Sequence, residues 1–191
     1  MNREPGFRVA FVCTGNRFRS PLAAGVFADE AARIGVGVDV DSFGVLDVAA
    51  APALPEALEL GTSFGVDLAA HRARALSRDT FAPHDLVVGF ERFHLATAVV
   101  DGGARRDATY TLPELVALLG DAEPVAVDDP IAYARVELAR VAKVRDAGPA
   151  FRGVPEIADP LGLPRRAQRT IAETVVQQTR ELARCLFGAG V

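Results

Sequence analysis

Residues 7–21 read FRVAFVCTGNRFRSP, and this stretch decides the predicted fold. Its first seven residues are almost all apolar and are bounded by Gly6 and Gly15, as is typical of a short buried strand. Ser20 and Pro21 are residue types that favour the start of a helix. The stretch therefore predicts a strand, a tight loop and a helix, in that order.

The rest of the chain alternates strand and helix patterns in the same way. Because parallel strands need crossover connections, this alternation favours a parallel sheet covered by helices. We expect an α/β fold, a three-layer sandwich with a central, mostly four-stranded parallel sheet. Further strands are predicted at residues 36–45, 85–90 and 108–111, and helices at residues 20–35, 57–64, 112–119, 131–146 and 171–185.

The composition excludes several classes of protein. Of the 191 residues, 50% are hydrophobic and 24% are charged, which suits one domain over residues 1–191 and excludes a disordered chain. The longest apolar runs are too short for a membrane helix. A net charge of -4 without a basic run makes the chain a poor candidate for nucleic-acid binding. Two cysteines cannot build a disulfide framework or a four-cysteine zinc site, so we expect a cytoplasmic protein.

The loop after the first strand has the residue types of a phosphate cradle. Ligands of parallel sheets bind beyond the carboxyl ends of the strands, which is where Cys13 is expected to lie. A loop that curls at a helix N-terminus points successive backbone N–H groups at an anion. Gly15 and Asn16 tolerate the left-handed backbone that such a curl needs, and Arg19 can offer a two-pronged guanidinium to two phosphoryl oxygens. We therefore expect phosphate to bind at Thr14, Gly15, Asn16, Arg17, Phe18, Arg19 and Ser20.

The same electrostatic field would favour a negatively charged sulfur. Cysteines near helix N-termini or cations ionise more readily than free cysteines, so we expect Cys13 to be a thiolate at neutral pH. The hydroxyl of Ser20 can donate a hydrogen bond to this sulfur and ease its later departure from phosphorus. These parts predict nucleophilic phosphoryl transfer through a phosphocysteine. The alternative is a structural cysteine that ends a buried strand.

Together with three further segments, this loop resembles the low-molecular-weight protein tyrosine phosphatase family. Ser42-Phe43-Gly44 is similar to the family's Ser-Ala-Gly segment, and residues 65–74, GVDLAAHRAR, are similar to its Gly-Ile-Asp-Leu…His-Arg-Ala-Arg stretch. Asp159-Pro160 resembles its Asp-Pro-Tyr loop before the final helix. The resemblance covers nearly the whole chain. It implies hydrolysis of phosphomonoesters, above all protein phosphotyrosine, with inorganic phosphate as product and with no metal or other cofactor.

The resemblance also implies roles for individual residues. Cys13 would be the nucleophile and Arg19 the phosphate clamp. Asp159 would protonate the leaving oxygen and then act as base on the water that cleaves the phosphoenzyme. The residues that match the polar network supporting the family's loop are Asn16, Ser20, Ser42 and His71.

The chain departs from the family around the substrate slot. Phe18 stands where the family often has a second cysteine, so protection of the nucleophile by a disulfide at that place is excluded. Leu161 and Val48 stand where aromatic residues commonly wall the slot, which weakens stacking on a phenyl ring. We expect part of this stacking surface to be replaced by Phe18, Phe43 and Leu163.

Residues 121–155 are longer than the family's usual connection, and we expect an extended helical connection there. This segment contains a second Asp-Pro pair, Asp129-Pro130, whose aspartate competes with Asp159 for the role of general acid. Asp159 is preferred because it directly precedes the final helix.

Two other functions stay open on the sequence alone. Related proteins on this fold reduce arsenate; since Cys185 is the only other cysteine, such a reductase would need an external thiol. A non-catalytic phosphate or phosphoprotein binder would keep the cradle without turnover, although it would not need an acid. Cys185 is expected in the core of the last helix, and His84 and His94 are expected to be surface or turn residues.

Overall fold

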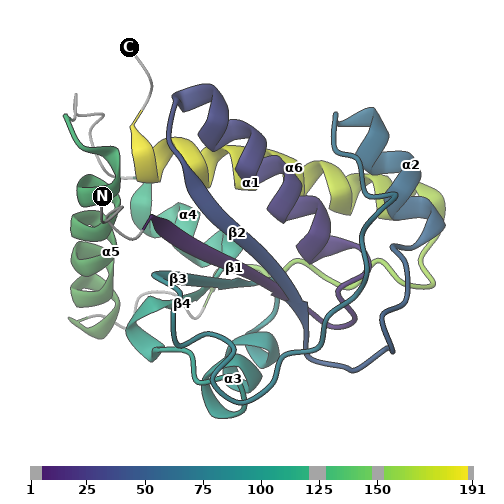
Figure 1. The fold of residues 1–191 in the computed structure, drawn as a ribbon, viewed down its shortest axis with the longest axis horizontal. Coiled ribbons are helices and arrows are strands. Elements are labelled where there is room, and N and C mark those ends of the chain that lie inside the picture. Colours follow the sequence, from purple (N-terminus) through teal and green to yellow (C-terminus); the bar gives the residue numbers. More distant parts are fainter. Residues whose placement is uncertain (1–5, 121–127, 148–152, 189–191) are drawn as a thin grey trace, which may run out of the picture.

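The computed structural model describes residues 6–120, 128–147 and 153–188, and it shows the predicted α/β sandwich (Figure 1). Four parallel strands form one sheet in the order β2-β1-β3-β4, with helices on both faces. The strands are β1 (Phe7–Cys13), β2 (Val38–Gly44), β3 (Leu86–Gly89) and β4 (Thr109–Thr111). The helices are α1 (Arg19–Ile34), α2 (Pro55–Ser63), α3 (Arg92–Val100), α4 (Leu112–Leu119), α5 (Pro130–Ala147) and α6 (Arg165–Phe187), with a short 3-10 turn, η1 (Arg106–Ala108).

Both layers of the core are built on β1, because successive side chains of a strand point to opposite faces. Phe7 and Phe11 point to one face, where they meet the ring of Phe187 in α6 and that of Phe27 in α1. The ring centroids are 5.4 Å apart in the first pair and 5.6 Å apart in the second. The opposite face of β1 packs in a smaller cluster that includes Ala98 of α3. Burial on both faces fixes the strand and hence the position of its carboxyl end.

The predicted elements are present with ends that differ by one or two residues, except that α6 begins at Arg165 and not at residue 171, and one helix was missed. The bounds of β1 and α4 are as predicted, and α5 occupies part of the connection predicted over residues 121–155. Residues 121–127 and 148–152 of that connection lie outside the described residues. α3 was not predicted, because residues 92–100 are apolar on most sides and show no polar face with a period of 3.6 residues. In the part of the chain that the structure describes, no helix is long and apolar enough to cross a membrane.

The carboxyl end of β1 is the switch point of the sheet. β1 pairs with β2 on one side and with β3 on the other. The connections that leave these strands therefore diverge at the carboxyl end of β1. Such a divergence leaves a crevice at the sheet edge, where ligands of α/β proteins bind. The end of β1 at Cys13 is paired with Gly44, the last residue of β2.

Candidate active site

Four carbonyl groups in and next to the loop after β1 accept hydrogen bonds from residues that surround the loop. Across a trans peptide the C=O of one residue points away from the N–H of the next, so outward carbonyls leave the N–H groups of residues 14, 15, 17 and 18 facing inward. Among the described residues, no N–H group of residues 14–18 has a hydrogen-bond partner. The four bound carbonyls are those of Cys13 (from Val45 N–H, 3.0 Å), Thr14 (from Leu46 N–H, 2.9 Å), Asn16 (from His71 Nε2–H, 2.7 Å) and Arg17 (from Leu54 N–H, 2.9 Å). The loop is therefore a cradle of free amides at the N-terminus of α1, which suits an anion.

Asn16 holds the curl of this loop. Its φ angle is 52°, in the left-handed region, where Asn is tolerated better than most residues. Its side-chain nitrogen donates to the hydroxyls of Ser20 and Ser42, both at 2.9 Å, and its side-chain oxygen accepts from the N–H of Arg74 at 2.8 Å. Burial lowers the pKa of His71, so its neutral ring donates from Nε2 to the Asn16 carbonyl. The structure thus brings together the four residues that the resemblance grouped as loop supports.

Gly44 lets the loop approach the end of β2. A Cβ atom at this position would lie 3.0 Å from the backbone nitrogen of Asn16 and 3.0 Å from the carbonyl carbon of Gly15. Real Cβ atoms rarely come so close to backbone, which cannot move without shifting the loop. Of the two loop residues expected to need a left-handed backbone, only Asn16 adopts it, since Gly15 has no positive φ.

Cys13 lies beneath this loop with its sulfur almost fully enclosed. The residue is 3% exposed, and its Sγ is 3.0 Å from the Ser20 hydroxyl. Ser20 lies in the first turn of α1, which begins at Arg19, and its hydroxyl serves the loop and not the helix end. The sulfur therefore sits at the N-terminus of α1, within hydrogen-bond distance of the Ser20 hydroxyl.

Arg19 is fixed by carboxylates on two sides. Its guanidinium is 1% exposed, and Nη1 donates to Glu91 Oε2 at 2.6 Å and to the carbonyl of Ile157 at 2.8 Å. Nη2 donates to the hydroxyl of Thr14 at 3.0 Å and to the carboxylate of Asp159. Segments from three distant parts of the chain thus meet at one side chain, which is held next to the Cys13 loop.

Glu91 and His94 are part of this site and were missed on the sequence. His94, expected to be a surface or turn residue, is fully buried at the start of α3. Its Nε2 lies 3.2 Å from the Thr14 hydroxyl, and its Nδ1 accepts from the N–H of Glu91 at 3.1 Å. Burial, with a contribution from the charge of Arg19, lowers the pKa of His94 to about 3. The signal that could have found the pair is its i, i+3 spacing just after an apolar strand, the spacing of a capping box.

The second Asp-Pro pair lies elsewhere. Asp129 accepts hydrogen bonds from the N–H groups of Ile131 and Ala132 at 3.0 Å, as a cap of α5. α5 lies beside the amino end of β1, away from its carboxyl end (Figure 1). The structure therefore brings Asp159 to Arg19 and leaves Asp129 at a helix end.

Two other expectations are wrong. Phe18 is buried, so its ring cannot wall a substrate slot, whereas the half-buried ring of Phe43 packs against Phe81 and lies under the guanidinium of Arg74. His84 is also buried, with its Nε2 3.3 Å from the carboxylate of Asp41. In each case the position of the side chain is set by tertiary packing, which the local sequence pattern does not reveal.

The surroundings of the loop carry exposed apolar side chains. Phe93 is 46% exposed and its ring lies 4.2 Å from that of His94. Leu46, whose N–H binds the Thr14 carbonyl, and Leu161, whose N–H binds Asp159, are also exposed. We call Leu46, Phe93 and Leu161 the apolar rim.

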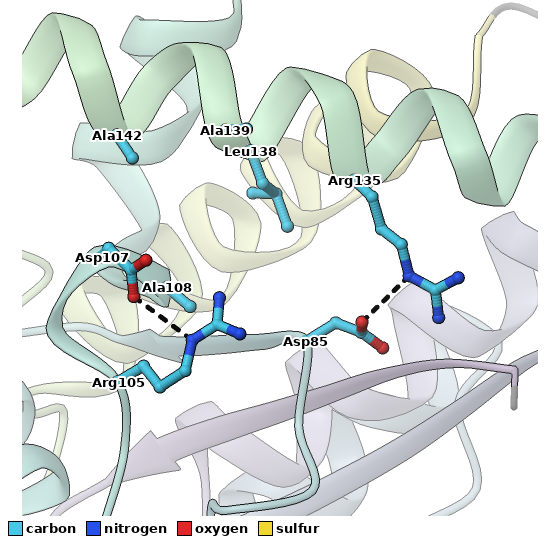
Figure 2. A pocket seen from close by; sticks show the side chains of 8 residues that line it. All are labelled: Asp85, Arg105, Asp107, Ala108, Arg135, Leu138, Ala139 and Ala142. Atoms are coloured by element: carbon cyan, nitrogen blue, oxygen red, sulfur yellow. Dashed lines mark hydrogen bonds and ion pairs between the residues drawn. The ribbon is translucent and has the colours of Figure 1, made fainter.

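A separate cavity lies at the amino end of the sheet, away from Cys13. It has a volume of about 260 Å³ and is lined by α5, η1 and Asp85, which precedes β3 (Figure 2). Its charges form ion pairs, Arg105 with Asp107 at 3.2 Å and Arg135 with Asp85 at 3.1 Å. Over residues 6–120, 128–147 and 153–188, no group of three or more His, Cys, Asp or Glu side chains is placed to hold a metal ion.

The fold and the site define a class of α/β protein in which a cysteine ends the first strand beneath a loop of free amides. A family model described as "Low molecular weight phosphotyrosine protein phosphatase" matches residues 8–148. A protein-arginine-phosphatase of Bacillus subtilis is 34% identical over 108 residues, which are 56% of this chain and 71% of the relative. A low molecular weight protein-tyrosine-phosphatase of Streptomyces coelicolor is 36% identical over 107 residues, 53% of this chain and 63% of the relative.

Solved structures agree with these matches. The low molecular weight protein tyrosine phosphatase from T. tengcongensis superposes with a TM-score of 0.67 at 26% identity, covering 92% of this chain and 97% of the other. The chain belongs to the low molecular weight phosphotyrosine protein phosphatase family. It is a protein-tyrosine-phosphatase-like phosphoric monoester hydrolase.

Proposed function

We propose that this protein removes phosphoryl groups from phosphoproteins through a phosphocysteine at Cys13, with phosphotyrosine as the preferred substrate. One observation carries the proposal: a buried cysteine is followed by a loop, residues 14–18, whose N–H groups find no partner among the described residues, and the guanidinium of Arg19 bonds the Thr14 hydroxyl of that loop. A phosphoryl transition state is loose and strongly charged, so positioned donors of this kind supply most of the catalysis.

In the first step the Cys13 thiolate attacks phosphorus. An S–P bond forms as the bond from phosphorus to the substrate oxygen breaks. Asp159, in its protonated form, gives its proton to the departing oxygen. Arg19 and the loop amides meet the charge on the three phosphoryl oxygens. The contact between the Asp159 carboxylate and Arg19 supports a position of Asp159 beside the bound phosphoryl group.

In the second step water attacks the phosphocysteine. Asp159, now ionised, takes a proton from the water as the new P–O bond forms and the S–P bond breaks. The products are inorganic phosphate and the Cys13 thiolate. The Ser20 hydroxyl, 3.0 Å from Sγ, stabilises the sulfur as it leaves.

The apolar rim supports an aryl phosphate as substrate. Phe93, Leu46 and Leu161 offer exposed apolar surface next to the loop, on which a phenol ring can bury its faces. Phosphoarginine is the second candidate, since two relatives are protein-arginine-phosphatases. A guanidinium needs hydrogen-bond acceptors, and Asp159 would have to serve both as its partner and as the acid.

Two measurements test the proposal. Hydrolysis of an aryl phosphate should be lost in Cys13→Ser, while Cys185→Ser, the matched change at the other cysteine, should keep it. Two peptides of the same sequence, one with phosphotyrosine and one with phosphoarginine, should differ in kcat/KM by at least tenfold in favour of phosphotyrosine. Retained hydrolysis in Cys13→Ser would overturn the mechanism, and a preference for phosphoarginine would overturn the substrate assignment.

A further inference from the structure

The Thr14 hydroxyl lies between two donors at the edge of the cradle. Its oxygen is 3.0 Å from Arg19 Nη2 and 3.2 Å from His94 Nε2. Arg19 always carries its protons, so the first contact is a hydrogen bond that Thr14 accepts. Whether the second contact is also accepted depends on the tautomer of His94.

The backbone fixes that tautomer. His94 Nδ1 faces the N–H groups of Phe90, at 3.3 Å, and Glu91, at 3.1 Å. Both are donors, so Nδ1 must be the acceptor and the ring proton must be on Nε2. Burial, aided by the charge of Arg19, lowers the pKa of His94 to about 3, which keeps the ring neutral. The Nε2–H group faces the Thr14 hydroxyl at 3.2 Å and Glu91 Oε2 at 3.6 Å, and the shorter contact, to Thr14, is the one within hydrogen-bond distance.

A hydroxyl has two acceptor lone pairs and one proton to donate. Arg19 and His94 each donate to one lone pair of the Thr14 hydroxyl oxygen. The proton of this hydroxyl can therefore only be donated to a third partner. No described residue accepts it, and the sulfur of Cys13 is already next to Ser20. We infer that the Thr14 hydroxyl donates to an oxygen of the bound phosphoryl group, and that His94 is the positioning residue that turns this proton toward the cradle.

This inference rests on the proposed function, because the acceptor is the phosphoryl group that Cys13 attacks. It adds one side-chain donor to the amides and to Arg19. It also gives the buried His94 a role that its neutral ring permits. The ring fixes the direction of the Thr14 hydroxyl proton and takes no part in proton transfer.

Binding of inorganic phosphate tests the inference without turnover. A hydrogen bond to a charged group is worth about a tenfold to hundredfold change in affinity. Thr14→Val, which removes the hydroxyl and keeps the shape, should weaken phosphate binding by at least about tenfold. Thr14→Ser, which keeps the hydroxyl, should stay within about threefold of the wild type. An equal affinity in Thr14→Val and Thr14→Ser would overturn the inference.

A double-mutant cycle tests the part played by His94. In His94→Asn the amide oxygen can still accept from the backbone, but the shorter side chain brings no donor to Thr14, whose hydroxyl then accepts from Arg19 alone. This variant should weaken phosphate binding about as much as Thr14→Val does, and the double variant should be no weaker than either single one. Additive losses would show that His94 acts independently of Thr14 and would overturn its positioning role.

Nitrogen-15 NMR of the folded wild-type protein gives a readout that does not depend on any variant. The imidazole of His94 should be neutral with its proton on Nε2 at pH 6, and a proton on Nδ1 would overturn the inference. Failure of the proposed function would appear differently, as hydrolysis retained in Cys13→Ser with the phosphate-binding results unchanged.

Discussion

Two substitutions of Asn16 should separate what its side-chain hydrogen bonds contribute to stability from the cost of its left-handed backbone. Asn16 is fully buried, makes three side-chain hydrogen bonds of 2.8 to 2.9 Å, and holds a φ of 52°. Asn16→Gly removes the bonds and keeps access to this φ. Asn16→Ala removes the bonds and also places a Cβ in the left-handed region.

The expected loss of stability follows from these contacts. Each net hydrogen bond contributes about 1 kcal/mol, so Asn16→Gly should lower the free energy of unfolding by about 3 kcal/mol. Asn16→Ala should lose about 1 kcal/mol more, because a residue with a Cβ is strained at this φ. Ala49→Gly is the matched control: its φ is 51°, it is exposed, and it should change stability by less than about 1 kcal/mol.

Urea unfolding of the three variants measures these differences, and inorganic phosphate binding reports on the loop. Both Asn16 variants should bind phosphate far more weakly than the wild type does, while Ala49→Gly should bind it normally. A loss below about 1 kcal/mol in Asn16→Gly, with normal phosphate binding, would refute the reasoning that this side chain holds the cradle.

Three further predictions concern the same region. Gly44→Ala should cost about 1 to 3 kcal/mol in urea unfolding, because its Cβ would lie 3.0 Å from loop backbone, and an unchanged midpoint would show that the loop can move aside. Asp159→Asn should lower kcat about 10²- to 10⁴-fold for an aryl phosphate with a poor leaving group, while Asp129→Asn should change it less than twofold; the reverse result would move the acid to Asp129. The pKa of His94 is lowered to about 3 from 6.5, so the unfolded chain takes up this proton first and stability is lost as the pH falls from about 6.5 toward 3. Between pH 7 and pH 5 the wild type should lose about 2 kcal/mol more than His94→Asn, and equal losses would contradict the neutral buried ring.

Much of the fold could be predicted because its core strands are short and apolar. Phe7 to Cys13 is enclosed on both faces, so periodicity and flanking glycines were enough to set its bounds. α3 was missed because its residues are apolar on most sides, and because its N-terminus is capped by Glu91 and His94, without the usual Ser or Thr. A local pattern cannot reveal a helix whose start depends on two side chains that also serve the site.

The part of the site that lies on one segment could be predicted, and the part that depends on tertiary contacts could not. Cys13 and Arg19 lie on one loop, so their spacing in the sequence was enough to predict a phosphate-binding loop with a cysteine nucleophile. Glu91 and His94 reach this loop only because β3 pairs with β1 and ends beside it. Phe18 shows the converse: it is part of the loop in sequence, yet its ring is buried in the core.

The central claim is that Cys13 attacks phosphorus. The most direct measurement is mass spectrometry of the peptide containing Cys13 after the Asp159→Asn variant has been mixed with an aryl phosphate and quenched in acid. The account predicts one phosphoryl group on Cys13, formed with release of the phenol and absent in Cys13→Ser. Release of phenol with Cys13 unmodified, or with the phosphoryl group on another residue, would contradict it.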